Sequence, residues 1–535
     1  MHLNGNGTID NVFIKPNDLL LKREPASVDV VPLPDSVQFP AELAAKACPW
    51  LDEYVAFSRK WSPRAHDDFH ESVGVWLLST VAARRVYCEL GGKRYTNLYI
   101  ALASRTSVFA KSTTAKIGIE LLKTAGLKHL LAADEATPQK FIKDMTYTVP
   151  ENWGQMSDTE KDAYIDRMTF AGQRGWYYDE FGQKISGMMR ENGFMSEFRG
   201  LLRRFDLNEN DYRYGTIGRG EDIVHAPYLA LLANLTPADL KPFAKRGGAL
   251  WSDGFWARFA FVTPPELAPR KNNRFPAEKK VDPASLLVPL RDWHERLGYT
   301  TPRITERGGG DSGRKTYTIA AVPPPEREVE LGKGVFNAFY DYDNALGEII
   351  TSRPATDIDG NYSRFAEKAI RIAVLLASFD GGDLIEMRHW ARAQQITEMW
   401  RCNLHNLYSQ VTNTTDGTTQ IDFEDRIMQR IVSNGPQTRR QMMQYINGLD
   451  SDTVNRVTES MLKAGVLVSL KNGKKEEFAL AVEASVGASH QNSSQNGSSA
   501  YENGVVEIYE ENSDATYTST QPSVGVGGVV TNIND

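Results

Sequence analysis

The chain has 535 residues, of which 41% are hydrophobic and 24% charged, a globular composition with room for roughly two to four domains. Its net charge of −7 does not decide nucleic-acid binding, because a basic patch can lie within an acidic chain. Three widely separated cysteines exclude a disulfide framework, and the sequence has neither a long apolar run nor a signal peptide. We therefore expect a soluble cytoplasmic protein without a membrane span.

The chain begins with an arm that is followed by helices. Residues 1–38 contain several prolines and no sustained periodicity, so we expect a flexible arm. Residues 39–95 are expected to form a helical subdomain. The strongest helical pattern covers 66–84, where apolar residues such as Val73 and Trp76 share one face.

A polar loop connects the next predicted strand to a predicted helix. The strand is the apolar run Leu98–Ala103, and the helical pattern covers 113–122. Lys111 and Ser112 end the loop. This order of strand, loop with Lys-Ser at its end, and helix is typical of a phosphate-binding loop. In such loops the Lys contacts the outer phosphates, and a Ser or Thr hydroxyl holds Mg²⁺.

This loop departs from the pattern G-x-x-x-x-G-K-[ST] at both glycines. Arg105 stands at the position of the first glycine and Ala110 at that of the second. Glycine serves such loops where φ is positive or where a phosphate approaches the backbone closely. A Cβ in a left-handed conformation costs roughly 1–2 kcal/mol. The alternative interpretation is an ordinary strand-to-helix connection that contains Lys-Ser.

Two acids follow the next predicted strand. The aromatic residues 176–178 run directly into Asp179 and Glu180. An apolar strand that ends in two acids is typical of the second nucleotide motif of P-loop ATPases. In that role Asp179 would hold Mg²⁺ through water, and Glu180 would orient and deprotonate the attacking water. The alternative is a strand end with solvated acids.

A third buried strand, 228–233, is followed by Asn234. A polar residue at the end of a central strand lies where ligands bind in open α/β sheets, which makes Asn234 a candidate sensor of the γ-phosphate. The alternative is a cap for the following helix, although Thr236 and Pro237 already supply one. Between the acids and this strand we expect one helix over Gly187–Phe205.

A single arginine precedes another apolar strand. Arg258 lies between aromatic residues in GFWARFAF, and a buried cation there needs an anionic partner. That partner is either a structural carboxylate or a nucleotide bound by an adjacent subunit. Residues 96–330 are expected to form the core that contains these motifs. Residues 331–415 are expected to form a helical extension, with a strong pattern over 361–379.

The C-terminal part is expected to form a separate small domain and a tail. Residues 421–482 contain three helical patterns and two short strands joined through Asn-Gly, which predicts a winged helix. Its candidate DNA-binding residues lie on the third helix and the wing: Asn455, Arg456, Lys471, Lys474 and Lys475. Such domains also mediate protein contacts. Residues 485–535 lack Lys and Arg and are expected to form a disordered acidic tail.

Five segments, in this order and spacing, resemble a known family. They are NLYIALASRTSVFAKSTTAK, WYYDEFG, LANLTP, GFWARF and SRFAEKAIRIAVLLA. Over about residues 40–410 the chain resembles the P-loop ATPase domain of primase-helicase-type proteins from phages, plasmids and integrated mobile elements. The resemblance implies an α/β fold, with a RecA-like or AAA-type P-loop NTPase core between helical extensions. It also implies ATP and Mg²⁺ as ligands, a homo-oligomer such as a hexameric ring, and a role near DNA replication.

The resemblance also assigns roles to single residues by their position. Lys111 and Ser112 are nucleotide ligands with Thr113 beside them, Asp179 and Glu180 are the Mg²⁺ and water residues, Arg258 is an arginine finger, and Arg364 is a second sensor. Because only about 40 residues precede the matched region, we expect any primase or other replication partner to be a separate chain.

These patterns leave three functions open. The first is a helicase-like ATPase that acts as a ring on single- or double-stranded DNA. The second is a non-hydrolysing relative that keeps the fold as a DNA-binding or assembly protein. The third is an initiator or partition factor, in which the winged helix finds a site and ATP only switches assembly. Retention of the lysine, both acids and the arginine favours the first and third hypotheses over the second.

Overall fold

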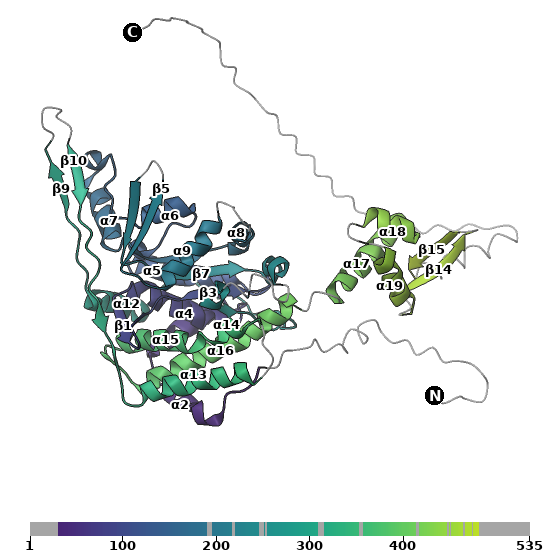
Figure 1. Cartoon of the computed structure of the whole chain (residues 1–535), viewed down its shortest axis with the longest axis horizontal. Coiled ribbons are helices and arrows are strands. Elements are labelled where there is room, and N and C mark those ends of the chain that lie inside the picture. The colour runs from purple at the N-terminus through teal and green to yellow at the C-terminus, as the bar shows by residue number, and fades with distance from the viewer. Residues whose placement is uncertain are drawn as a thin grey trace, which may run out of the picture. The chain divides into compact units, whose positions relative to one another are not determined.

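The computed structural model describes the chain in segments (Figure 1). They are residues 30–189, 195–216, 220–244, 251, 254–308, 315–352, 357–412, 417–446, 449, 451–463, 466–472 and 475–480. The chain divides into two units, Met1–Asp422 and Phe423–Asp535. Of the expected arm, residues 1–38, the structure describes 30–38, where the carbonyls of Val31 and Val37 accept hydrogen bonds from Arg401 and Gln394. The expected tail, residues 485–535, lies outside the described residues.

The helices of the larger unit are α2 (Ala41–Ala44), α3 (Pro49–Trp61), α4 (Asp67–Ala82), α5 (Lys111–Thr124), α6 (Pro138–Asp144), α7 (Asp158–Thr169), α8 (Phe181–Met188), α9 (Ser196–Asp206), α10 (Pro237–Leu240), α12 (Ala284–Leu297), α13 (Val335–Thr351), α14 (Asp359–Tyr362), α15 (Phe365–Phe379) and α16 (Met387–Thr412). Its strands are β1 (Val86–Glu89), β2 (Lys93–Tyr95), β3 (Tyr99–Ala103), β4 (Gln173–Tyr178), β5 (Asp211–Thr216), β6 (Gly220–His225), β7 (Tyr228–Leu235), β8 (Phe259–Val262), β9 (Ile304–Arg307), β10 (Thr316–Ile319), β11 (Arg327–Glu328), β12 (Glu330–Leu331) and β13 (Leu384–Ile385).

A parallel sheet lies at the centre of this unit. Its four strands have the order β4-β7-β3-β8, and every neighbouring pair is parallel. All residues of β3, β7 and β8 are buried, which is the near-continuous apolar pattern of a parallel sheet covered on both faces. Because these strands point the same way, the residues that follow β3, β4 and β7 lie at one edge. The predicted α/β class is confirmed.

Different helices cover the two faces of the sheet. On one face α4 packs across all four strands, and Gly175 of β4 lies so close to Thr80 that a Cβ would overlap the threonine side chain. The next residue along β4, Trp176, points to the other face and stacks on Phe198 of α9, with ring centroids 5.5 Å apart. Residues of β4 therefore alternate between the α4 side and the α9 side.

Two expected helices end differently from their sequence patterns. Helix α4 ends at Ala82, before the expected residue 84, because Ala83 and Arg84 have φ values of 44° and 66°. The single helix expected over Gly187–Phe205 is wrong, since α8 ends at Met188 and α9 begins at Ser196. The sequence between them contains Asn192 and Gly193, which are poor helix formers.

Helices and small sheets surround the central sheet. Helix α15 packs against α16, and α16 contacts β8, so the expected extension forms part of the same hydrophobic core. The hairpin of β9 and β10 projects from this unit (Figure 1). In the described part of the chain, no helix has both the length and the apolar character needed to cross a membrane.

The smaller unit has its own core. It contains α17 (Gly417–Asn434), which begins before the unit boundary, then α18 (Arg439–Tyr445), α19 (Ser451–Lys463), β14 (Leu467–Asn472) and β15 (Lys475–Leu480). The two strands pair antiparallel, with Asn472 opposite Lys475. Three helices followed by a hairpin are the order of elements expected for a winged helix. Ile427, Val457 and Phe478 are among the residues of its core.

The close contact between β4 and α4 predicts a stability effect. Gly175→Ala should lower the free energy of unfolding by about 1–3 kcal/mol, because the added methyl group overpacks a buried interface. Gly200→Ala in α9 is the matched control: no heavy atom lies within 4 Å of the new Cβ, so higher helix propensity should stabilise the chain by up to about 1 kcal/mol. Urea unfolding followed by tryptophan fluorescence measures both, and equal effects would contradict the close contact.

Candidate functional site

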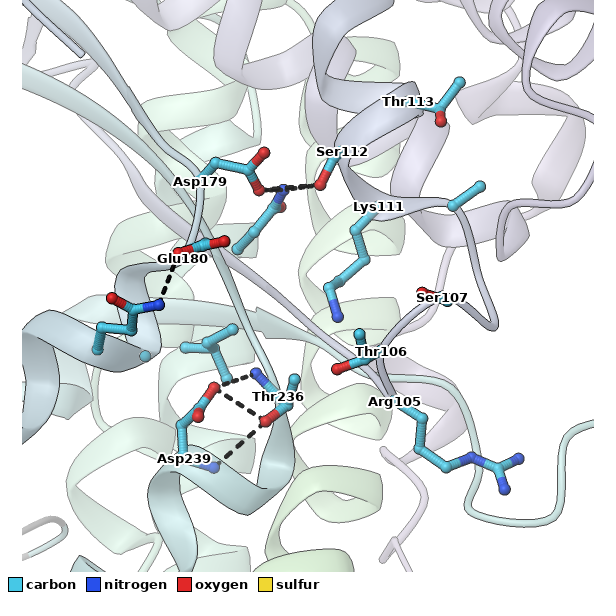
Figure 2. A pocket seen from close by; sticks show the side chains of 15 residues that line it. Arg105, Thr106, Ser107, Lys111, Ser112, Thr113, Asp179, Glu180, Thr236 and Asp239 are labelled. Carbon is cyan, nitrogen blue, oxygen red and sulfur yellow. Dashed lines mark hydrogen bonds between the residues drawn. The ribbon is translucent and has the colours of Figure 1, made fainter. Parts of the chain in front are cut away.

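A cavity of about 480 Å³ lies at the sheet edge where β3, β4 and β7 end (Figure 2). It is lined by Arg105, Thr106, Ser107, Ala110, Lys111, Ser112, Thr113, Asp179, Glu180, Gly182, Gln183, Asn234, Leu235, Thr236 and Asp239. Loop residues after β3, both acids after β4 and the asparagine at the end of β7 therefore meet around one space. The sequence patterns had placed each of these groups at a strand end.

The N-terminus of α5 opens on this cavity. Helix α5 begins at Lys111, and no side chain of a described residue caps it. Its first turn contains no acidic residue, so the unpaired N–H groups and the positive end of the helix dipole are left for an anion. The loop before α5 can therefore bind an anionic group such as phosphate.

The backbone conformation differs between the two positions where the pattern has glycine. Ala110, at the second glycine position, has φ 47° and ψ 37°, so it adopts the left-handed conformation that glycine would adopt without strain. Ser107 in the same loop also has a positive φ, 60°. Arg105 is exposed and does not share this conformation. The left-handed conformation is thus present at the second glycine position, at a conformational cost of roughly 1–2 kcal/mol at Ala110.

Lys111 extends into the cavity (Figure 2). Its Nζ donates a hydrogen bond to the backbone carbonyl of Ser104 at the start of the loop. Burial lowers the pKa of Lys111 to about 8, and the nearby carboxylates of Asp239 and Asp179 act in the opposite direction. A polyanion in the cavity would favour the protonated amine.

A hydrogen-bond network joins the ends of the three strands. Asp179 Oδ1 accepts from Ser112 Oγ at 2.9 Å and from Asn234 Nδ2 at 2.9 Å. Asn234 Nδ2 also lies 3.3 Å from Ser112 Oγ and 3.0 Å from the hydroxyl of Tyr177. Asn234 is 3% exposed, and its Oδ1 is buried without a hydrogen-bond partner among the described residues.

Glu180 has a constrained position at the start of α8. Its φ of 52° places it in the left-handed region, and its Oε2 accepts a hydrogen bond from Gln183 Nε2 at 2.6 Å. Thr236 and Asp239 form the capping box of α10, so Asn234 is not needed as a cap. Asp239 lies directly over Gly182, where a Cβ would overlap its carboxylate. The helices after β4 and β7 are therefore in close contact.

The donor set fits a magnesium ion that is shared with phosphate. The Ser112 hydroxyl and the Asp179 carboxylate face each other as hard oxygen ligands (Figure 2). Asn234 Nδ2 donates to the same carboxylate, and its Oδ1 is buried without a partner among the described residues. Among the described residues no group of three or more His, Cys, Asp or Glu side chains could hold a metal alone.

The charges that line the cavity also favour a divalent cation. Three carboxylates line the cavity (Asp179, Glu180 and Asp239), against the two cations Arg105 and Lys111. A triphosphate entering alone would meet net negative charge, because the carboxylates outnumber the cations. A divalent cation between Asp179 and the phosphates would compensate that repulsion.

Arg258 and Arg364 lie at the opposite edge of the sheet. Arg258 Nε is 3.0 Å from Asp206 Oδ2, and Arg364 Nη1 is 3.6 Å from the same oxygen. Arg371 also contacts Asp206, at 2.9 Å, and donates to the carbonyl of Asn97, two residues before β3 begins. This group therefore lies where the strands start, whereas the cavity lies where they end.

Of the two partners expected for Arg258, the structural carboxylate is present within the chain. Burial lowers the pKa of Arg258 and the neighbouring Arg364 adds to this, while Asp206 opposes it. The predicted roles as arginine finger and second sensor require a nucleotide bound by another copy of the chain. Those two roles stay predictions.

The predicted DNA-binding residues lie on the smaller unit. Asn455 and Arg456 are exposed on α19, and Lys471 is exposed on β14. Asp452 and Glu459 are also exposed on α19, so its outer face carries both signs of charge. Lys474 lies outside the described residues, as does the side chain of Lys475.

Sequence patterns missed three residues at this site. Tyr177 contacts Asn234. Tyr177 and Asp179 are two residues apart, and side chains two apart in a strand share a face, so this spacing could have indicated that Tyr177 lies at the site. Gln183 lies three residues after Glu180, which is the spacing of neighbours on a helix. Asp239 belongs to the capping pattern Thr-x-x-Asp, which predicts the start of a helix. That pattern gives no indication that Asp239 also lines the cavity.

No family model matches the sequence, and no curated protein matches it. Among solved structures, the chain is similar to a full-length MCM homolog from Methanopyrus kandleri, with 13% sequence identity and a TM-score of 0.33. The alignment covers 70% of this chain and 63% of that chain, so this chain spans less than two thirds of the archaeal protein. The assignment of the site rests on the geometry above.

The conformation of Ala110 predicts that glycine is favourable there. Ala110→Gly should raise the free energy of unfolding by up to about 1 kcal/mol, because relief of left-handed strain exceeds the extra entropy of glycine in the unfolded chain. Ala115→Gly within α5 is the control and should cost about 1 kcal/mol or more, because Ala115 is buried in a right-handed helix. Chemical denaturation measures both variants, and a loss of stability in Ala110→Gly as large as that of the control would contradict the strained loop.

Proposed function

We propose that this chain is a P-loop ATPase linked to DNA, helicase-like in type, that serves the replication or maintenance of a mobile genetic element. The observation that carries the proposal is the convergence of four groups on one cavity. They are the uncapped α5 N-terminus with Lys111, the Ser112–Asp179 pair, Glu180 and Asn234. Anion binding, metal binding and activation of water each have a residue of suitable chemistry there.

Each residue has a distinct task in hydrolysis of the γ-phosphoryl group. The N–H groups at the start of α5 and the amine of Lys111 bind phosphate oxygens of ATP. Ser112 and Asp179 would hold Mg²⁺, which when bound neutralises charge that develops on the phosphates. Glu180 orients a water molecule and accepts its proton as the water oxygen attacks phosphorus. Asn234, which donates to Asp179 from β7, is the proposed sensor of the γ-phosphate.

DNA and a second copy of the chain are the proposed partners. The order of elements in the smaller unit supports DNA contact through α19 and the wing. Arg258 and Arg364 are bound to a buried carboxylate at the far edge of the sheet, so a role in catalysis needs an adjacent copy, as in a hexameric ring. A primase or other replication partner would be a separate chain.

One observation favours a second candidate, in which ATP switches assembly or is bound without turnover. Ala110 stands at the second glycine position, and its Cβ hinders the close approach of a phosphate to the backbone that glycine permits. This lowers the affinity for phosphate relative to a loop with glycine. A replication initiator, or a non-hydrolysing DNA-binding protein, would tolerate that loss better than a motor.

ATP turnover with and without DNA separates these functions. We expect the wild type to hydrolyse ATP, with stimulation by single-stranded or duplex DNA. Lys111→Ala should abolish nucleotide binding, whereas Glu180→Gln should keep binding and lower the turnover number at least a hundredfold, since it removes the proton acceptor. A coupled phosphate-release assay and equilibrium binding of a fluorescent ATP analogue measure the two quantities.

The outcomes of that experiment are distinct. Absence of both binding and turnover in the wild type would exclude the ATPase. Binding without turnover at any DNA concentration would favour the non-hydrolysing protein. DNA-stimulated turnover without strand displacement on a forked duplex would favour the ATP-switched initiator over the helicase.

The lowered pKa of Lys111 predicts how ATP affinity depends on pH. In the free protein Lys111 loses its proton above about pH 8, well below the ordinary value of 10.5, because it is buried. Phosphate binds the protonated amine, so the dissociation constant for ATP should rise above pH 8 and approach a tenfold rise per pH unit. Lys111→Arg stays charged and should give a flat profile between pH 7 and 9.5. A flat profile in the wild type would contradict a role for this amine.

A further inference from the structure

Tyr177 lies directly behind the predicted metal ligands, and the proposed function does not use it. Its hydroxyl is 3.0 Å from Asn234 Nδ2, and Asn234 in turn donates to Asp179 Oδ1 at 2.9 Å. Tyr177 pairs with Leu232 in the register of β4 and β7. Asn234, two residues further along β7, therefore projects to the same face of the sheet.

The hydrogen bonds of Asn234 fix the orientation of its side-chain amide. Nδ2 carries two hydrogens, and the nearest acceptors are Asp179 Oδ1 and the Tyr177 hydroxyl. Ser112 Oγ, at 3.3 Å, is farther away and already donates to Asp179. With both hydrogens engaged, the amide keeps its donor side toward Asp179 and its unpartnered oxygen away from it.

The Tyr177 hydroxyl is suited to this role. Its ring belongs to a strand whose neighbours are buried, and an aromatic side chain has only two rotatable χ angles. A phenol hydroxyl can both accept and donate a hydrogen bond, so Tyr177 can accept from Asn234 Nδ2. Loss of the hydroxyl would leave Ser112 Oγ, 3.3 Å away and itself a predicted metal ligand, as the remaining acceptor for that hydrogen.

We propose that Tyr177 is a positioning residue for the divalent-cation site, which acts through Asn234 to hold Asp179 against Ser112. This inference rests on the proposed function, because the ligand is a divalent cation bound together with a nucleotide triphosphate. Residues that orient metal ligands from behind commonly change metal affinity by 10–100-fold when they are removed. Tyr177 therefore sets how tightly the cation is held, and it does not touch the phosphates.

Tyr177→Phe tests this inference, because it removes one oxygen atom and keeps the ring. Equilibrium binding of Mn²⁺, followed by electron paramagnetic resonance in the presence of ATP, should be about tenfold weaker than in the wild type. The Mg²⁺ concentration for half-maximal ATP turnover should rise by a similar factor. At saturating Mg²⁺, the turnover number and the KM for ATP should return to within about twofold of the wild type.

Tyr178→Phe is the matched control. Tyr178 is the next residue of the same strand and points to the other face, where it contacts Trp176 and Phe181. Its variant should bind Mn²⁺ as the wild type does. Thermal unfolding of both variants monitors folding, because a general loss of structure would affect the two substitutions and all ligands alike.

A double-mutant cycle tests whether Tyr177 acts through Asn234. In an Asn234→Ala background, Tyr177→Phe should have little further effect on Mn²⁺ affinity, because the group that it positions is gone. Additive losses would overturn the inference.

Failure of this inference is distinguishable from failure of the proposed function. If the wild type binds Mn²⁺ with ATP and Tyr177→Phe binds it equally well, the role of Tyr177 is overturned and the ATPase proposal stands. If the wild type binds both ligands without turnover, hydrolysis is excluded and the Mn²⁺ titration still decides the role of Tyr177. If the wild type binds no Mn²⁺ with ATP, both are overturned.

Discussion

Hydrogen bonds to a single oxygen atom, Asp179 Oδ1, hold three strand ends together. Ser112 reaches it from the start of α5 after β3, and Asn234 reaches it from β7. This geometry depends on parallel pairing, because only strands that run in the same direction bring these residues to one edge. The loop before α5, the acids before α8 and the cap of α10 are all placed relative to this point. The chemistry of the cavity is thus a consequence of sheet topology.

The two edges of the sheet have different electrostatic character. At the strand ends, Lys111 is near acids that line an open cavity. At the strand starts, Arg258, Arg364 and Arg371 surround Asp206, and Glu367 pairs with Arg364 and Arg371. Removing either carboxylate would leave a buried cation with one anionic partner fewer. The arginines at the strand starts therefore have partners within the chain, whereas the acids at the strand ends line an open cavity.

The local parts of this structure could be predicted from the sequence, and the parts that depend on distant residues could not. The strand before Lys111, the acids after β4 and the polar residue in β7 each have a local signal, namely an apolar run that ends in a chemically distinctive side chain. The partner of Arg258 is Asp206, 52 positions earlier in the chain, and no local pattern connects them. The role of Tyr177 was equally hidden, because an aromatic residue in a buried strand normally signals core packing.

The hydrogen bond between Lys111 and the Ser104 carbonyl has a mechanical consequence. The ammonium group has three N–H donors, so an anion can bind the remaining two while the bond to Ser104 is kept. Ser104 in turn donates its own N–H to the carbonyl of Leu235 at 3.2 Å, which links the start of the loop to the end of β7. The amine is therefore tethered to the backbone of the sheet before a ligand arrives, and a ligand meets it with little freedom left to lose.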